Sequence, residues 1–177
     1  MLNLIPNEYD IKEYKSSNYK NITLCEMFGR YLLKEKLSEK YNSNYVLFTA
    51  PIYDNWDVEL STPDGRKYFE IKLRNQTYSS MLLEVDKYNK LVKDNKLSFY
   101  VNITTDTNKL IMWDLSNYNI KNIPIEQKYC PRTTYSDKND YVMKDCYMLP
   151  ISTGYTYNYN FSVTEMKNEF EKQLKNN

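Results

Sequence analysis

Hydrophobic positions along the chain follow two periods, and each period predicts a different kind of element. In two segments the apolar residues recur at every third or fourth position, which is typical of amphipathic helices. These segments run from Thr23 to Tyr41 and from Ser79 to about Asp94. Elsewhere apolar residues alternate with polar ones or form short runs, which predicts strands at residues 45–49, 55–61, 67–73, 97–104 and 109–115.

Turn and capping residues indicate where these elements begin and end. The sequence Thr62-Pro63-Asp64-Gly65-Arg66 separates residues 55–61 from residues 67–73, and its Pro, Asp and Gly predict a hairpin turn. Beyond Ser116, residues 141–151 and 155–161 are expected to be strands. Ser162-Val163-Thr164-Glu165 has the spacing of a capping box, which predicts a last helix to about Leu174.

The order of these elements predicts an α/β fold. A helix, three strands, a second helix and a further strand fit a central mixed sheet flanked by helices. A chain of 177 residues is long enough for one domain with its own core. We therefore expect a single domain over residues 1–177, with a core at 22–104 and a C-terminal extension of extra strands and a helix at 105–177.

Composition narrows the chemistry that this fold can carry. The chain has no histidine, which excludes Ser-His-Asp and Cys-His hydrolases, HNH nucleases and His-based zinc hydrolases. Hydrolysis would have to rely on carboxylates, lysine, tyrosine and hard metal ions. The three cysteines are scattered and form no C-x-x-C pair, which fits reduced thiols in the cytoplasm. A net charge of +1 gives no global signal for nucleic acid, although it leaves room for a local positive groove.

Strand alternation places several charged residues on one face of the predicted hairpin. On the first strand Asp57 and Glu59 share a face, opposite to the face of Trp56, Val58 and Leu60. On the second strand Tyr68, Glu70 and Lys72 share a face, opposite to the face of Phe69, Ile71 and Leu73. Pairing around the short turn would bring Asp57 close to Glu70 and Lys72, although a solvated hairpin face is the alternative reading.

The order of elements, with Asp57 on the second strand and Glu70-Ile71-Lys72 on the third, resembles the PD-(D/E)xK, or restriction-endonuclease-like, nuclease superfamily. The resemblance extends over about residues 23–104, and the proline that leads the family motif is absent before Asp57. It implies the restriction-endonuclease-like core, helix-strand-strand-strand-helix-strand. A chain rich in Asn, Lys, Tyr and Ile is typical of an A+T-rich genome, which favours a phage or bacterial member.

The resemblance implies a metal-dependent catalytic site. Asp57 and Glu70 would hold Mg²⁺ or Mn²⁺, with the backbone carbonyl of Ile71 as a third ligand. The ion would polarise the phosphate and activate a water, while Lys72 would orient that water or stabilise charge on phosphorus. Glu26 on the first helix is an additional candidate ligand, but a capping role with Thr23 is the favoured alternative.

The second predicted helix supplies candidates for substrate binding. Tyr88 matches the tyrosine of the Gln-x-x-x-Tyr motif of RecB-like nucleases, whereas Glu84 stands where that motif has glutamine. Lys87 is a candidate phosphate contact, with a solvated helix charge as the alternative reading.

The predicted function is that of a Mg²⁺-dependent hydrolase of DNA phosphodiester bonds, an endonuclease in preference to an exonuclease. A nuclease-fold protein without turnover, acting as a phage-encoded binding or inhibitor protein, is the alternative. RNA is an alternative substrate, and a homodimer is a further possibility for the assembly. No stretch approaches the ~20 apolar residues that span a membrane, and no signal peptide is recognised. We therefore expect no membrane partner and a cytoplasmic location, in the host cytoplasm if the gene is a phage gene.

Overall fold

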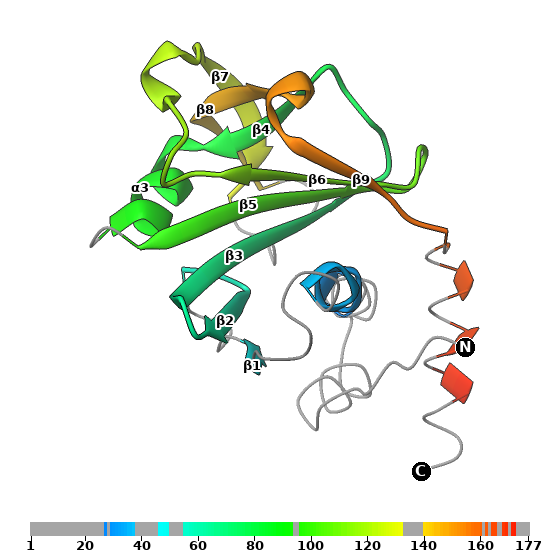
Figure 1. Cartoon of the computed structure of the whole chain (residues 1–177). Coiled ribbons are helices and arrows are strands. Elements are labelled where there is room, and N and C mark those ends of the chain that lie inside the picture. The colour runs from blue at the N-terminus through cyan, green and yellow to red at the C-terminus, as the bar shows by residue number, and fades with distance from the viewer. Residues whose placement is uncertain are drawn as a thin grey trace.

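In the part of the chain that the structure describes, the strands form two sheets, and a helix lies on either side of the larger sheet (Figure 1). The computed structural model describes residues 27, 29–37, 46–49, 55–93, 96–132 and 140–160, together with scattered positions between 162 and 172. Residues 29–37 are helical and form the blue coil in Figure 1. No helix in these described parts is long and apolar enough to cross a bilayer.

The larger sheet has six strands in the order β1-β2-β3-β5-β6-β9. Its β3 and β5 are parallel and all its other neighbours are antiparallel, so the sheet is mixed. The strands are β1 (Val46–Thr49), β2 (Val58–Thr62), β3 (Gly65–Arg74), β5 (Leu97–Thr104), β6 (Lys109–Asp114) and β9 (Tyr155–Asn158).

The smaller sheet is antiparallel and has the order β4-β8-β7. Its strands are β4 (Ser80–Glu84), β7 (Ile125–Pro131) and β8 (Tyr141–Pro150). Helix α3 (Val85–Val92) follows β4 directly and leads back to β5, which gives β3 and β5 their parallel crossover. The short 3-10 helices are η2 (Ile120–Asn122) and η3 (Ile151–Thr153).

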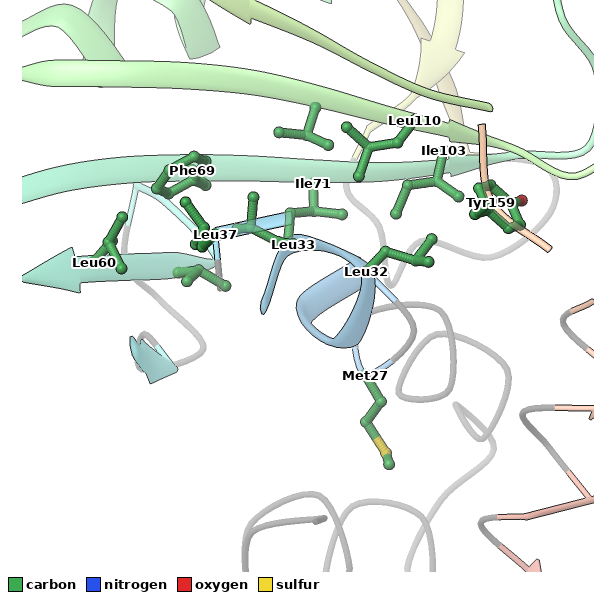
Figure 2. Close-up of a cluster of buried hydrophobic side chains, with 12 residues drawn as sticks. Met27, Leu32, Leu33, Leu37, Leu60, Phe69, Ile71, Ile103, Leu110 and Tyr159 are labelled. Carbon is green, nitrogen blue, oxygen red and sulfur yellow. The ribbon is translucent and has the colours of Figure 1, made fainter. Parts of the chain in front are cut away.

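The helix at residues 29–37 covers one face of the larger sheet, as Figure 2 shows. Its buried leucines meet alternate side chains of β2, β3 and β5, and Gly29 lies so close to β3 that a Cβ there would overlap with the side chain of Ile71. The buried members of this first core are Met27, Leu32, Leu33, Leu37, Val58, Leu60, Phe69, Ile71, Val101, Ile103, Leu110 and Tyr159.

The opposite face of the larger sheet packs against α3 and the smaller sheet. Met81 and Leu83 of β4 and Leu91 of α3 bury their side chains against Tyr100 of β5 and Trp113 of β6. Since β3 and β5 alternate, the residues between those of the first core point toward this second layer. Glu70 and Lys72 are among them, so α3 lies on their side of the sheet.

The α/β fold with a central mixed sheet flanked by helices is confirmed. The expected order of helix and strands is present, with β4 inserted between β3 and α3. The hairpin turn is confirmed by Gly65, whose φ of 115° favours glycine, and by the hydroxyl of Thr62, which donates to its carbonyl at 3.0 Å. The capping box is confirmed as well, because Ser162 N–H donates to Glu165 Oε2 at 2.7 Å and Glu165 N–H donates to Ser162 Oγ at 3.0 Å.

Two expectations about local structure were wrong. The second helix begins at Val85 and not at Ser79, because Ser80–Glu84 pairs as a strand with β8 and buries Met81 and Leu83. Trp56 does not share the face of Val58 and Leu60 but packs beside the second core. The physical reason is that β2 begins only at Val58, so strand alternation does not apply to Trp56.

Candidate active site

The hairpin of β2 and β3 brings Asp57 beside Glu70 and Lys72. Val58 pairs with Phe69 at the start of β2, and Asp57 N–H donates to Phe69 O at 2.8 Å. Asp57 therefore stands where β2 begins, alongside the middle of β3. Its carboxylate is close enough to Glu70, Lys72 and Lys87 for all three charges to act on it.

Glu70 is the most deeply buried charged side chain of this group, with no exposed surface at all. Lys72 Nζ lies 2.5 Å from its Oε1 and Lys87 Nζ lies 2.8 Å from its Oε2. The two lysine side chains remain 38% and 28% exposed, so each ammonium group joins the buried carboxylate to the surface. An unpaired buried carboxylate would be very costly, which explains why two cations converge on this one.

Each oxygen of Glu70 is paired with one ammonium group, and the pairing with Lys72 includes a hydrogen bond. Among the described residues, no donor besides these two lysines meets either oxygen. Buried carboxylate oxygens are normally satisfied by several donors. Each oxygen of Glu70 therefore keeps a further lone pair that a metal ion could use.

The carboxylate of Asp57 is held by the backbone of β3. Ile71 N–H donates to Asp57 Oδ2 at 2.6 Å, a short bond of the charge-assisted kind. In a strand the N–H and C=O of one residue point to the same side, so the Ile71 carbonyl also faces the side on which Asp57 lies. The role of this carbonyl as a metal ligand stays a prediction.

Electrostatics shift the pKa values of this group in opposite senses. Burial, and then the negative charge of Glu70, raise the pKa of Asp57, while Lys72, the Ile71 N–H and Lys87 partly offset that rise. Burial alone would lower the pKa of Lys72, but attraction by Glu70 and Asp57 outweighs it and raises that pKa. Lys72 consequently stays an ammonium ion at neutral pH.

The donor set matches what a small hard cation requires. Magnesium is commonly bound by one or two carboxylates, retained waters and substrate phosphates. Asp57 and Glu70 supply two carboxylates that are close enough to interact, and Ile71 would supply a carbonyl. No group of three or more acidic, Cys or His side chains suited to a metal occurs in the described ranges. The candidate ligand Glu26 lies outside those ranges.

The two candidates on α3 have different surroundings. Lys87 pairs with Glu70 and thus belongs to the charged group. Tyr88 packs edge-on against Tyr147 of β8, with ring centroids 5.4 Å apart, beside the second core. Glu84, just before α3, pairs with Lys144 of β8 at 3.0 Å.

Sequence reasoning missed a polar extension of this group along β3. Arg74 donates through Nε to Asn102 Oδ1 at 3.2 Å and through Nη2 to Tyr100 OH at 3.3 Å and to Leu82 O at 3.4 Å. Because Glu70, Lys72 and Arg74 alternate along one strand, the sequence pattern itself could have indicated Arg74. Its hydrogen bonds tie β3 to β5 and β4 beside the candidate site.

An aromatic pair adjoining the site was also missed. The rings of Trp56 and Tyr68 lie 4.6 Å apart, and Lys96 Nζ lies 4.3 Å and 5.3 Å from their centroids. These contacts are cation–π interactions that join the start of β2 to the residue before β5. Trp56 directly precedes Asp57, and Tyr68 lies two residues before Glu70 on β3.

Comparison with known proteins gives a distant structural likeness. No protein-family model matches the chain, and no curated protein matches its sequence. Among solved structures, the chain is similar to a Holliday junction resolvase from the archaeal hyperthermophile Archaeoglobus fulgidus. The likeness has a TM-score of 0.44 and 10% sequence identity, and it covers 72% of this chain and 89% of the resolvase chain.

Proposed function

We propose that this protein is a metal-dependent nuclease that hydrolyses phosphodiester bonds of DNA at internal positions. The single observation that carries the proposal is the fully buried carboxylate of Glu70, joined to Lys72 and Lys87 and close to Asp57. Besides burial, the negative charge of Glu70 raises the pKa of Asp57, so two carboxylates act on one another here. Two neighbouring carboxylates are typical of a site that binds a hard divalent cation.

Asp57, Glu70 and the Ile71 carbonyl would hold Mg²⁺ or Mn²⁺. The ion, when bound, would supply a Lewis acid for the phosphate and a water of lowered pKa. Asp57 is positioned for this by the Ile71 N–H, and Glu70 by burial between β3 and α3. Neither carboxylate can move far without losing those contacts, so the two act as a preorganised pair.

Lys72 would act on the reacting phosphate. It stays protonated at neutral pH, and its side chain is 38% exposed beside a fully buried partner. An ammonium ion in this position can donate to a phosphate oxygen or to the attacking water. Because charge on the phosphate oxygens changes as the bond breaks, that contact stabilises the transition state more than the ground state.

The partly exposed side chains of Lys72 and Lys87 favour an anionic polymer as the substrate. We propose DNA as this polymer, with RNA as the alternative that a substrate panel decides. We propose endonuclease action in preference to processive exonuclease action, and the same panel distinguishes them if it includes closed circular DNA. The expected setting is phage or bacterial DNA metabolism or defence, in the cytoplasm.

The test is Mg²⁺-dependent cleavage of linear, branched and single-stranded DNA and of RNA. Lys72→Ala should lower the cleavage rate by on the order of 10²–10³, the loss typical of one transition-state contact. Lys72→Arg should rescue poorly, since a planar guanidinium does not replace a compact ammonium. Calorimetric titration with Mn²⁺ should show that Lys72→Ala retains metal binding, because the carboxylates remain.

Arg66→Ala is the matched control for these variants. Arg66 pairs with Glu59 at 3.2 Å on the same hairpin, but its side chain is 68% exposed. This variant should cleave as the wild type does. Equal cleavage by wild type and Lys72→Ala would remove Lys72 from the mechanism.

A nuclease-fold binding protein without turnover is the second candidate, and the Lys87 contact favours it. Lys72 and Lys87 each pair with one oxygen of Glu70 and also attract the nearby Asp57, so two ammonium groups balance the two carboxylates without a metal. Binding of DNA with no cleavage of any substrate in Mg²⁺ or Mn²⁺ would select this candidate over the enzyme.

A further inference from the structure

Strand β7 forms an edge of the smaller sheet, and its backbone orientation can be deduced from one hydrogen bond. In the order β4-β8-β7, β8 is the strand that pairs with β7 within the described part of the chain. Arg132 N–H donates to Asp140 O at 2.9 Å in the same register as the β7–β8 ladder. Backbone groups of even-numbered residues therefore point to β8, and those of odd-numbered residues point to the free edge.

Ile125, Gln127 and Tyr129 thus direct their N–H and C=O groups outward. Ile125 and Tyr129 also have large exposed side chains, at 55% and 69%. Pro131 comes next on the same edge and has no N–H to offer, so the edge that can pair ends there. A strand edge that no other strand of the described residues covers tends to pair with another strand.

The side chains along this edge are self-complementary around Gln127. The sequence Ile125-Glu126-Gln127-Lys128-Tyr129 is apolar, acidic, neutral, basic and apolar in turn. When two antiparallel copies are aligned on Gln127, apolar residues therefore face apolar residues and each acidic residue faces a basic one. Glu126 and Lys128 lie on one face and already pair within the chain at 2.6 Å, with side chains 47% and 38% exposed. Ile125 and Tyr129 lie on the other face.

We propose that β7 pairs with β7 of a second copy of this chain, antiparallel and centred on Gln127. The two Gln127 residues would exchange two backbone hydrogen bonds, and each Ile125 would exchange two with Tyr129 of the other copy, about six in all. The two smaller sheets would become one six-stranded sheet across a twofold axis.

The charges select this register over its neighbours. Centred on Gln127, the pairing places Glu126 opposite Lys128 of the other copy in a non-hydrogen-bonded pair, where Cα atoms approach to about 4.5 Å. A shift of the centre to Lys128 would place two lysines opposite each other, and a shift to Glu126 would place two glutamates there. Like charges directly opposite in a ladder are destabilising. The charges of Glu126 and Lys128 therefore favour the register that is centred on Gln127.

This inference does not depend on the proposed function, because β7 lies in the smaller sheet and contributes no residue to the group around Glu70. The contact involves one short strand from each copy, so it belongs to the small and weak class of interfaces. The dimer should accordingly form and dissociate with concentration in the micromolar range.

Charge exchange across the axis provides the test, with sedimentation velocity over a micromolar concentration series as the readout. The wild type should change from monomer to dimer across the series. Lys128→Glu places glutamates opposite each other and Glu126→Lys places lysines opposite each other, so each variant alone should stay monomeric. A mixture of these two variants should form a heterodimer, because every cross-strand pair again joins unlike charges.

Two further variants separate pairing from folding. Gln127→Pro removes an N–H that points away from β8, so it should weaken dimerisation while leaving the thermal unfolding of the monomer close to that of the wild type. Lys121→Glu carries the same charge change as Lys128→Glu at an exposed position outside β7, and it should still dimerise.

A wild type that stays monomeric throughout the series would overturn the proposal. So would a wild-type dimer that persists in both charge variants, since that would place the interface elsewhere. Failure of the mixed variants to associate, with both folded as judged by circular dichroism, would exclude this register.

Discussion

The middle of β3 buries an apolar side chain on one face of the six-stranded sheet and a charged one on the other. Phe69 and Glu70 are neighbours on β3, and both are almost completely inaccessible, at 2% and 0% exposure. Phe69 points to the helix at residues 29–37 and stacks on Phe99, with ring centroids 5.0 Å apart and planes inclined by 17°. Glu70 points to α3 and meets two lysines.

Burial stabilises the protein at Phe69, whereas at Glu70 it costs free energy that the paired lysines have to offset. On the face covered by the helix at residues 29–37, apolar side chains need only close packing and no hydrogen-bond partners, so their burial stabilises the fold. On the α3 face, a buried carboxylate requires matching cations, and such an arrangement stabilises little compared with apolar packing. A carboxylate that stays buried despite the cost of its desolvation is a candidate for function.

The largest effect on stability is expected on the apolar face. Phe69→Ala should lower the free energy of unfolding by about 3–5 kcal/mol, because it leaves a cavity and removes the contact with Phe99. Glu70→Gln should cost less, about 1–3 kcal/mol, since Lys72 and Lys87 can turn their ammonium groups to water. Urea denaturation of both variants measures the difference. A larger loss of unfolding free energy in Glu70→Gln than in Phe69→Ala would mean that the charged group contributes more to stability than the apolar packing does.

The sequence alone predicted the parts of this contrast that depend on local pairing. Asp57, Glu70 and Lys72 come together because a turn of a few residues fixes the register of β2 and β3, and their catalytic roles stay a prediction. The faces of β3 could be predicted for the same reason, since alternation needs no knowledge of distant strands.

Elements defined by distant partners could not be predicted in this way. Strand β4 was interpreted as the start of a helix because its partner β8 lies far along the chain, with Leu83 opposite Tyr147. Strand β7 was not predicted, because it packs only one well-buried residue, Cys130. Lys87 was a candidate for phosphate, but its pairing with Glu70 depends on how α3 docks, which no local pattern determines.

Metal binding should add stability only through the charged face. If Asp57 and Glu70 hold Mg²⁺, a concentration one hundred times the dissociation constant should stabilise the protein by about 2.7 kcal/mol. Asp57→Asn should abolish this gain, because it removes a charged ligand while keeping the shape. Thermal unfolding with and without Mg²⁺ checks both proteins. An equal gain in the two would place the cation elsewhere.

Acid should stabilise the metal-free protein through Asp57. The pKa of this carboxyl is raised in the folded state by burial and by Glu70, above about 3.9 in an unfolded chain. The folded protein therefore holds the proton more tightly, and this contribution to stability is lost as pH rises from about 4 through the folded pKa. Each tenfold change in proton affinity corresponds to about 1.4 kcal/mol. Asp57→Asn should remain stable where the wild type loses this contribution, so the difference between their unfolding free energies should grow with pH across that window. A constant difference would contradict the prediction.

The smallest effect is expected for the other ion pair on the same hairpin. Glu59 lies opposite Tyr68 in the β2–β3 ladder, so it shares the face of Glu70, and it pairs with Arg66 at 3.2 Å. Arg66 is 68% exposed, and surface pairs of this kind are worth about 0–1 kcal/mol because water competes for both charges. Arg66→Ala should therefore change the unfolding free energy by no more than this amount, and less in high salt. Urea denaturation at low and high ionic strength measures it, with Arg66→Lys as the control that keeps the charge. A loss as large as that of Glu70→Gln would show that position on this face, and not burial, determines what an ion pair contributes.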